Sequence, residues 1–316
     1  MKSLIRSFLA QLLRLIPHRV GSALMSLLQT HRDIADSWGV HIRRINYYEP
    51  LPDFREITEA STLVRRESAA IDFDLPGQIR LQQLVASPVR EELQTIAEKP
   101  ESEGGYPFDN DYFSYLDAAV YYALIRHLKP VRVVEIGCGF STRIADKALK
   151  ANREEGHRGG LTCIEPYPQA RLTDFKLEME LIEKRVEDVP LAFFSALTAN
   201  DILFIDSSHA VKFRSDVCRE FLEILPVIQP GVWVHVHDIF FPTDYPARWL
   251  IDQRIAFNEQ YLLEAFLAFN PHFKPTAALR WLWMDHRTDL SSWWPDEVQP
   301  PGDDLGAASF WMKRIS

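Results

Sequence analysis

One stretch of this sequence, residues 131–142, restricts the fold more than any other. It begins with the apolar, mostly β-branched run Val131–Val134, continues through Glu135 and ends in a turn that contains two glycines. A helical pattern follows over residues 143–149. A strand, a tight turn and a helix in this order bring backbone N–H groups and a helix N-terminus close to a ligand. The stretch therefore predicts the ligand-binding turn of an α/β fold.

A second acid supports this interpretation. Glu165 ends the short strand-like run Leu161–Ile164 and lies 26 positions beyond Gly139. In α/β nucleotide folds, an acid at the tip of the second strand hydrogen-bonds ribose hydroxyls. A dinucleotide fingerprint would also have a third glycine at position 142, where this chain has Thr142. We therefore expect a ligand that carries a ribose. Thr142 leaves less room for a pyrophosphate in the turn, whereas the helix N-terminus would still suit a carboxylate.

Composition sets the broad class. The chain has 316 residues, of which 47% are hydrophobic and 25% charged, and this is typical of a globular protein with about two domains. Its net charge of −9 argues against general nucleic-acid binding. The three cysteines are far apart and odd in number, which favours reduced thiols in a cytoplasmic protein.

The N-terminal segment has a different character. Residues 1–50 carry seven basic and three acidic side chains, a net charge of +4, and apolar residues recur at helical spacing over Met1–Gln29. The apolar run is too short and too charged to cross a bilayer, and it lacks the small-residue cleavage site of a signal peptide. Two interpretations stay open. The helix packs on its own domain or on a second subunit of a homo-oligomer, or it lies peripherally on an anionic membrane.

The polar, breaker-rich segment Lys99–Gly105 is the best linker, so we divide the chain into a mainly helical extension, residues 1–105, and a domain of residues 106–316. In that domain strand-like and helical segments alternate, which predicts a doubly wound, mostly parallel sheet. Five strands are expected at Val131–Ile136, Leu161–Ile164, Glu178–Arg185, Asp201–Ile205 and Val232–His237.

The C-terminal part completes this Rossmann-like sheet with seven strands. A long helix is expected at about residues 248–269. Two strand-like runs follow, Leu279–Met284 and Ser309–Ile315. Because only loop is expected between them, we predict that they form an antiparallel hairpin at the sheet edge.

Acidic residues and histidines follow two of the predicted strands. Asp206 and His209 come after one strand, and His237 and Asp238 end the next. Open α/β sheets build their sites at these carboxyl ends. Asp206, His237 and Asp238 are candidate ligands of a divalent cation, and His209 is a candidate general base. The structural alternative is that Asp206 caps a helix and the histidines bond local carbonyls. We expect a core position for His235, which is deeper in its strand.

Glu135 is a further candidate, because an acid near the end of a buried strand is costly unless it is paired or faces a ligand. A cationic group such as an amino-acid ammonium would compensate that cost. Ser141 and Thr142 are good helix-capping residues, which is a sufficient structural reason for both. Cys138 is interpreted as a small residue that fits the turn rather than as a reactive thiol.

With these motifs in view, the chain resembles class I S-adenosylmethionine-dependent methyltransferases. The matching elements are Val134–Gly139, Ile164–Pro166, Phe204–His209 and Gly231–Asp238, and the resemblance covers roughly residues 106–316. Within the class, the two strand-end clusters and the aromatic segment Phe240–Pro246 resemble metal-dependent sugar O-methyltransferases of the macrocin and mycinamicin type.

The resemblance implies roles for individual residues. Asp206 and Asp238 would be metal ligands and His209 the base, whereas the family has an acid where this chain has His237. That difference favours softer ions over magnesium, or a metal-free site that works through His209. The amino-acid end of the cofactor would meet the turn, the ribose would meet Glu165, and the adenine would lie near the pair after the third strand. The implied cofactor-binding residues are Glu135, Gly137, Cys138, Gly139, Ser141, Thr142, Glu165, Glu187 and Asp188.

The leading hypothesis is therefore O-methylation of a hydroxyl on a small-molecule or glycan acceptor, with S-adenosylmethionine as cofactor and with or without a divalent cation. Two alternatives remain. A nicotinamide dehydrogenase would share the fold, although the missing third glycine argues against it. A catalytically silent binding or assembly protein would keep the fold without turnover.

Overall fold

The structure is a computed structural model, and it describes all residues except 1–16, 42, 169–176 and 303–305. The chain forms two compact units, residues 1–57 and residues 58–316. In the first unit, α2 spans His18–Thr30 and α3 spans Arg32–Ser37. The N-terminal part of the predicted amphipathic helix, residues 1–16, lies outside the described residues.

One side of α2 is apolar and open to solvent. Val20, Leu24 and Leu27 follow each other at helical spacing, and each side chain is largely exposed. The contact of this segment with a membrane surface or with a second subunit stays a prediction. Within the described part of the chain, every helix is too short or too polar to cross a membrane.

The second unit is built around one sheet. Its strands are β1 (Arg132–Ile136), β2 (Gly160–Ile164), β3 (Glu180–Ile182), β4 (Ile202–Ile205), β5 (Trp233–Val236), β6 (Phe273–Ala278) and β7 (Phe310–Arg314). Their order is β3-β2-β1-β4-β5-β7-β6, with parallel pairing from β3 to β5 and antiparallel pairing of β7 with both β5 and β6. The predicted seven-stranded, doubly wound sheet with an antiparallel C-terminal edge is confirmed.

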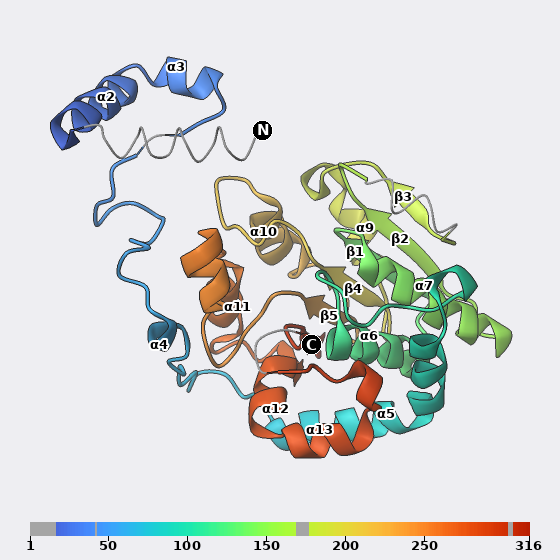
Figure 1. The fold of residues 1–316 in the computed structure, drawn as a ribbon. Coiled ribbons are helices and arrows are strands. Elements are labelled where there is room, and N and C mark those ends of the chain that lie inside the picture. Colours follow the sequence, from blue (N-terminus) through green and yellow to red (C-terminus); the bar gives the residue numbers. More distant parts are fainter. Residues whose placement is uncertain (1–16, 42, 169–176, 303–305) are drawn as a thin grey trace. The chain divides into compact units, whose positions relative to one another are not determined.

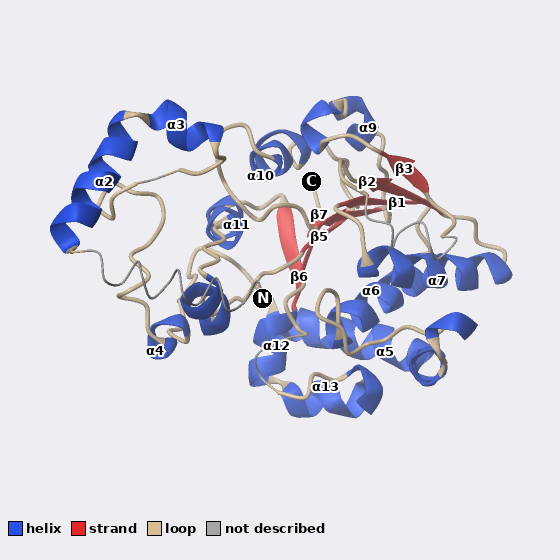
Figure 2. Cartoon of the chain, turned by 45° about the horizontal axis from the view of Figure 1, so that its top comes forward, coloured by secondary structure: helices blue, strands red, loops and turns tan. Residues whose placement is uncertain are grey.

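Helices cover both faces of this sheet (Figures 1 and 2). On one face lie α5 (Leu75–Glu98), α6 (Tyr115–Leu128) and α7 (Phe140–Glu154). On the other face lie α9 (Leu191–Ser195), α10 (Asp216–Arg219) with the π-helical turn Glu220–Ile224, and α11 (Glu259–Leu267). Among the described residues of this unit, the remaining helices are α4 (Glu59–Thr62), α12 (Leu279–Asp285) and α13 (Arg287–Trp293), with short helical turns at Glu101–Glu103, Val186–Asp188, Arg248–Gln253 and Asp296–Val298.

The alternation of side chains along each strand creates two cores. In β4, Ile202 and Phe204 pack with the α5–α6–α7 layer, whereas Leu203 and Ile205 pack with the α9–α10–α11 layer. All four are fully buried, as expected for a parallel strand that is covered on both faces. This alternation also turns Glu135 of β1 toward α6 and α7.

Two predictions about the C-terminal part are wrong. Leu279–Met284 is helical and lies within α12, and the strand that pairs with β7 is the preceding segment, β6. Helices α12 and α13 therefore lie between the two edge strands, where only loop was expected. A short apolar run has no periodicity that separates a strand from a buried helix. The predicted helix over residues 248–269 is also interrupted, because a loop separates its first turn from α11.

The compact unit also begins earlier than residue 106, where the sequence placed the boundary. Val85, Val89 and Leu93 of α5 are buried in the same core as α6. Gln78 Oε1 accepts a 2.7 Å hydrogen bond from the backbone of Ala278 in β6. Helix α5 therefore belongs to the sheet-containing unit rather than to a separate extension.

Phe204 is the residue through which we test this core. It is fully buried and stacks on Tyr121 and on His235, with ring centroids 4.6 and 3.9 Å apart. We expect Phe204→Ala to lower the free energy of unfolding by about 3–5 kcal/mol, because it leaves a cavity in a packed core. Phe213→Ala is the control, because residue Phe213 is 93% exposed and its replacement should change stability by no more than about 0.5 kcal/mol. Urea denaturation measures both, and equal losses would contradict the assignment of the core.

Candidate functional site

The tips of three parallel strands meet at Gly137. Its N–H donates to Ile164 O at the end of β2 (3.0 Å), and Asp206 N, just after β4, donates to Ile136 O (2.9 Å). Gly137 has a φ of +81°, and a Cβ at this position would lie 1.8 Å from Asp206 O. Only glycine fits here, because a side chain would collide with the backbone of Asp206 and because residues with a side chain rarely adopt this left-handed φ. The glycine turn therefore joins the ends of β1, β2 and β4 at one rim of the sheet.

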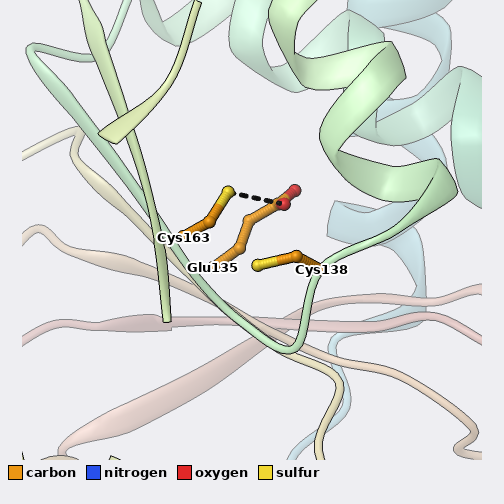
Figure 3. Close-up of side chains that lie close together, drawn as sticks. All are labelled: Glu135, Cys138 and Cys163. Atoms are coloured by element: carbon orange, nitrogen blue, oxygen red, sulfur yellow. Dashed lines mark hydrogen bonds between the residues drawn. The ribbon is translucent and has the colours of Figure 1, made fainter. Parts of the chain in front are cut away.

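Glu135 lies beneath this turn and is satisfied from within the protein. Its carboxylate accepts hydrogen bonds from Tyr121 Oη (3.0 Å) and Thr142 Oγ1 (2.6 Å), and the Cys163 thiol is 3.7 Å away (Figure 3). Burial raises the pKa of Glu135 to about 7, although these hydrogen bonds oppose the rise. The buried acid is thus paired internally, and the expectation that it must face a cationic ligand is not needed to explain it.

Cys138 lies beside Glu135 in the same pocket of side chains (Figure 3). Glu135, Cys138 and Cys163 each have a potential metal-ligand atom within 4.8 Å of the others. Burial raises the pKa of the Cys138 thiol well above its usual value, whereas a nucleophile must be a thiolate. Cys138 therefore fits the predicted role of a small residue in the turn.

A cavity of about 380 Å³, called here the first cavity, opens at the strand tips above the turn. Gly137, Glu165, Glu187 and Asp206 line it, together with the loop Lys212–Asp216. Its volume lies in the range of small-molecule and cofactor sites. Four strand ends thus contribute to one concave site, as predicted for an open α/β sheet.

The predicted cofactor residues divide into two groups around the first cavity. Gly137, Glu165 and Glu187 line it directly. The others support the turn or lie apart: Thr142 accepts from Gly139 N at 3.0 Å, Asp188 is exposed, and Glu135, Cys138, Gly139, Ser141, Thr142 and Asp188 are not among the residues that line the cavity. Contact of the second group with a cofactor stays a prediction. Arg185 and the loop Lys212–Asp216 also line the cavity, but they have no sequence motif by which they could have been predicted.

Asp206, His209 and Asp238 come together as a carboxylate–imidazole cluster. Nε2 of His209 lies 3.2 Å from Asp206 Oδ1 and 3.4 Å from Asp238 Oδ2. Nδ1, on the other side of the ring, lies 2.8 Å from Glu259 Oε2. His209 and Glu259 are buried, whereas Asp206 and Asp238 are partly exposed toward the cavities. The juxtaposition predicted from the two strand ends is present, and Glu259 is an addition that sequence spacing did not reveal.

The charges in this cluster stabilise each other. Burial alone would lower the pKa of His209, but the hydrogen bonds that its ring donates to Asp206 and Glu259, and the charge of Asp238, raise it well above its usual value. Burial likewise opposes ionisation of Asp206, but His237 and His209 outweigh it and hold the pKa of Asp206 well below its usual range. The protein on its own therefore favours an imidazolium between carboxylates.

The two histidines at the end of the β5 segment, His235 and His237, have different surroundings. Nδ1 of His237 lies 3.5 Å from both Asp206 Oδ1 and Asp238 Oδ1, so His237 borders the cluster. His235 is fully buried, and its Nε2 lies 2.8 Å from Ser309 Oγ. The predicted core position of His235 is therefore what the structure has.

A divalent cation is chemically compatible with the cluster. Asp206, His209 and Asp238 each offer one ligand atom, and these three atoms lie within 4.8 Å of one another. Two carboxylate oxygens and an imidazole nitrogen suit borderline ions such as manganese, iron or zinc. The sequence had predicted His237 as the nitrogen ligand, whereas this geometry brings His209 closer to both carboxylates.

A second cavity, of about 800 Å³, also borders the cluster. His237 and Asp238 line it, as do aromatic residues and the polar segment before α6. The aromatic residues are Tyr112, Tyr115, Phe240, Trp249 and Phe257. A third cavity of about 530 Å³ shares Phe240, Arg248 and Trp249 with it. The cluster therefore lies between a cavity at the glycine turn and a larger, aromatic one.

Comparisons with known proteins identify the family. Residues 134–239 match a family model described as a methyltransferase domain. The chain is 34% identical over 167 residues to an uncharacterized protein of Archaeoglobus fulgidus, an alignment that covers 50% of this chain and 74% of that protein. The chain belongs to the class I S-adenosylmethionine-dependent methyltransferases. The match begins in β1 and ends just after Asp238, so it includes the glycine turn and the cluster.

Solved structures resemble this methyltransferase more distantly. An O-methyltransferase from Bacillus cereus in complex with SAH is 13% identical, with a TM-score of 0.40, over 72% of this chain and 91% of that one. The MycE methyltransferase of the mycinamycin biosynthetic pathway, in complex with Mg, SAH and mycinamycin VI, is 17% identical, with a TM-score of 0.37, over 69% and 54%. Similarity at this level carries no argument about the acceptor or the metal.

The raised pKa of Glu135 predicts how stability depends on pH. Because the folded-state pKa (about 7) exceeds the usual value of 4.5, the stability that Glu135 contributes is present below pH 4.5 and is lost as the pH rises through 7. Between these pH values the free energy of unfolding should fall by about 3 kcal/mol relative to the Glu135→Gln variant. Urea denaturation across this range measures the difference. The exposed Glu180→Gln is the control, and parallel curves for wild type and Glu135→Gln would contradict the assignment.

Proposed function

We propose that this methyltransferase methylates a hydroxyl group of a small-molecule or glycan acceptor. The observation that carries the proposal is the position of the carboxylate–imidazole cluster between two cavities. Asp206 lines the first cavity and Asp238 lines the second. Nε2 of His209 lies 3.2 Å from the Asp206 carboxylate and 3.4 Å from the Asp238 carboxylate. A general base must reach the hydroxyl proton of the acceptor while the same oxygen lies in line with the methyl carbon, and a cluster that borders both cavities supports such an arrangement.

The first cavity is the proposed cofactor site. Glu165 and Glu187 supply carboxylates for hydroxyl and amino groups of the nucleoside, and the narrow turn at Gly137 lets the ligand approach the backbone. S-adenosylmethionine, when bound, supplies a methyl group on a positively charged sulfur, which is already electrophilic. The protein then has two tasks, to align the acceptor oxygen with the methyl carbon and to take up the hydroxyl proton.

His209 is the proposed base. The acceptor oxygen forms a bond to the methyl carbon, the bond from that carbon to sulfur breaks, and the hydroxyl proton passes to Nε2 of His209. His209 must be neutral when the acceptor binds, so activity should rise with pH as the ring loses its proton. The neighbouring carboxylates raise the pKa of His209, and the rise in activity should therefore lie above the usual pKa of histidine.

Asp206 and Asp238, with the imidazole of His237, would hold a divalent cation, since Nε2 of His209 cannot bind the ion and also take the proton. When bound, such an ion lowers the pKa of a coordinated hydroxyl and fixes its orientation. It would also offset the carboxylate charges that favour the protonated ring. A site without a metal, in which His209 alone takes the proton, remains the alternative mechanism.

The second cavity is the proposed acceptor site. Its rings provide flat apolar surfaces, and Asp109, Asn110 and Asp111 provide hydrogen-bonding groups. Sugars present both an apolar face and hydroxyl groups, and such a lining suits both. A nicotinamide dehydrogenase is disfavoured, because Thr142 occupies the position of the third glycine of a dinucleotide fingerprint.

Replacement of His209 tests its role as the base. We expect His209→Gln to lower kcat by roughly 10²- to 10⁴-fold, the usual contribution of a general base. The affinity for S-adenosylmethionine should stay within about threefold of wild type, since His209 does not line the first cavity. Stopped assays with labelled cofactor and calorimetry measure the two quantities. The exposed His157→Gln is the matched control, and an unchanged kcat in His209→Gln would rule out the proposed base.

Removal of metal tests the cation. If an ion offsets the charge of Asp206 and Asp238, chelation should move the rising limb of the kcat–pH profile to higher pH, because the pKa of His209 then rises. Adding back manganese or zinc should restore the original profile. A profile that is the same before and after thorough chelation, verified by elemental analysis, would remove the metal from the mechanism.

A further inference from the structure

Behind His209 lies a carboxyl group that the sequence does not connect with the site. Glu259 is the first residue of α11, its side chain is fully buried, and its Oε2 accepts a 2.8 Å hydrogen bond from Nδ1 of His209. It lines neither the first nor the second cavity, so it contacts the reacting groups only through the imidazole. We propose that Glu259 is a positioning residue that holds the Nδ1–H of His209 and thereby directs Nε2 to the reacting proton.

The backbone around His209 is held by the same helix start. The N–H groups of Asn258 and Glu259 both donate to His209 O, at 3.1 and 3.3 Å. Asn258 Oδ1 also accepts from Val211 N at 2.6 Å. His209 itself has a φ of +55°, a conformation that costs free energy for a residue with a side chain and persists only where its surroundings enforce it. The end of the loop and the ring are thus fixed by one element, α11.

The direction of the ring follows from this arrangement. The two ring nitrogens point to opposite sides, so a hydrogen bond from Nδ1 to Glu259 turns Nε2 toward Asp206 and Asp238. A carboxylate on Nδ1 also stabilises the positive charge that the ring gains when Nε2 accepts a proton. Phe257, with its ring centroid 4.9 Å from that of His209, packs against the ring. Glu259 therefore defines both the orientation and the proton-accepting atom of the base.

A neighbouring carboxyl group supplies a matched control. Glu220 is as buried as Glu259, and its Oε2 accepts from Ser207 Oγ at 3.2 Å rather than from the imidazole. If the loss of any buried carboxyl group lowers activity, Glu220→Gln and Glu259→Gln should lose activity alike. If the loss acts through His209, only Glu259→Gln should lose activity.

The proposal rests on the proposed function, so its test combines a kinetic and a spectroscopic readout on the full chain. We expect Glu259→Gln to lower kcat by roughly 10- to 100-fold, while KM and cofactor affinity stay within about twofold. The double variant His209→Gln/Glu259→Gln should be no slower than His209→Gln alone, because Glu259 acts only through the ring. An additive loss in the double variant, or an unchanged kcat in Glu259→Gln, would overturn the proposal.

The second readout does not depend on turnover. In ¹⁵N-histidine-labelled protein, the buried Nδ1 proton of His209 should give a downfield, slowly exchanging ¹H–¹⁵N signal, assigned by its absence in His209→Gln. We expect this signal to shift or disappear in Glu259→Gln and to persist in Glu220→Gln. Persistence in Glu259→Gln would overturn the proposal even if no acceptor were methylated. Should Glu259→Gln fail to fold, Glu259→Asp, which withdraws the carboxylate by one methylene, must shift the same signal.

Discussion

The close approach of β1 and β4 at Gly137 is the constraint on which the rest of the site depends. Asp206 O occupies the space that any other side chain at position 137 would need. The same contact brings Asp206 to the edge of the first cavity and places His209, three residues further on, beside Asp238 at the end of β5. A change in the register of these parallel strands would therefore separate the first cavity from His209.

Buried charge is the second organising feature. Three carboxylates surround His209, and two of them also face cavities, so the cluster is stable only while the imidazole stays between them. Burial of such groups is costly unless their partners are well placed. The left-handed backbone conformation of His209 and its hydrogen bonds to the start of α11 hold the imidazole between the carboxylates. The free energy that fixes the site thus comes from the helical layer behind the sheet.

Much of this site could be predicted from the sequence, for a physical reason. Asp206, His209 and Asp238 follow strands, and parallel strands end at one rim, so their proximity follows from topology. Glu259 lies 50 positions from His209 in sequence, and no local pattern connects the two. Glu135 was expected to face a ligand, because the sequence does not reveal Tyr121 and Thr142 as its partners. The prediction of a strand at Leu279–Met284 was wrong, because an apolar run of this length suits a buried helix equally well.

The decisive question is which cofactor the first cavity binds, because every proposed role assumes a methyl donor there. Calorimetric titration of the wild-type chain with S-adenosylhomocysteine, and separately with NAD, distinguishes the two kinds of site. We predict that each chain binds one S-adenosylhomocysteine, that NAD gives no measurable heat, and that Glu165→Ala loses the binding of S-adenosylhomocysteine. Binding of NAD without S-adenosylhomocysteine would contradict this prediction.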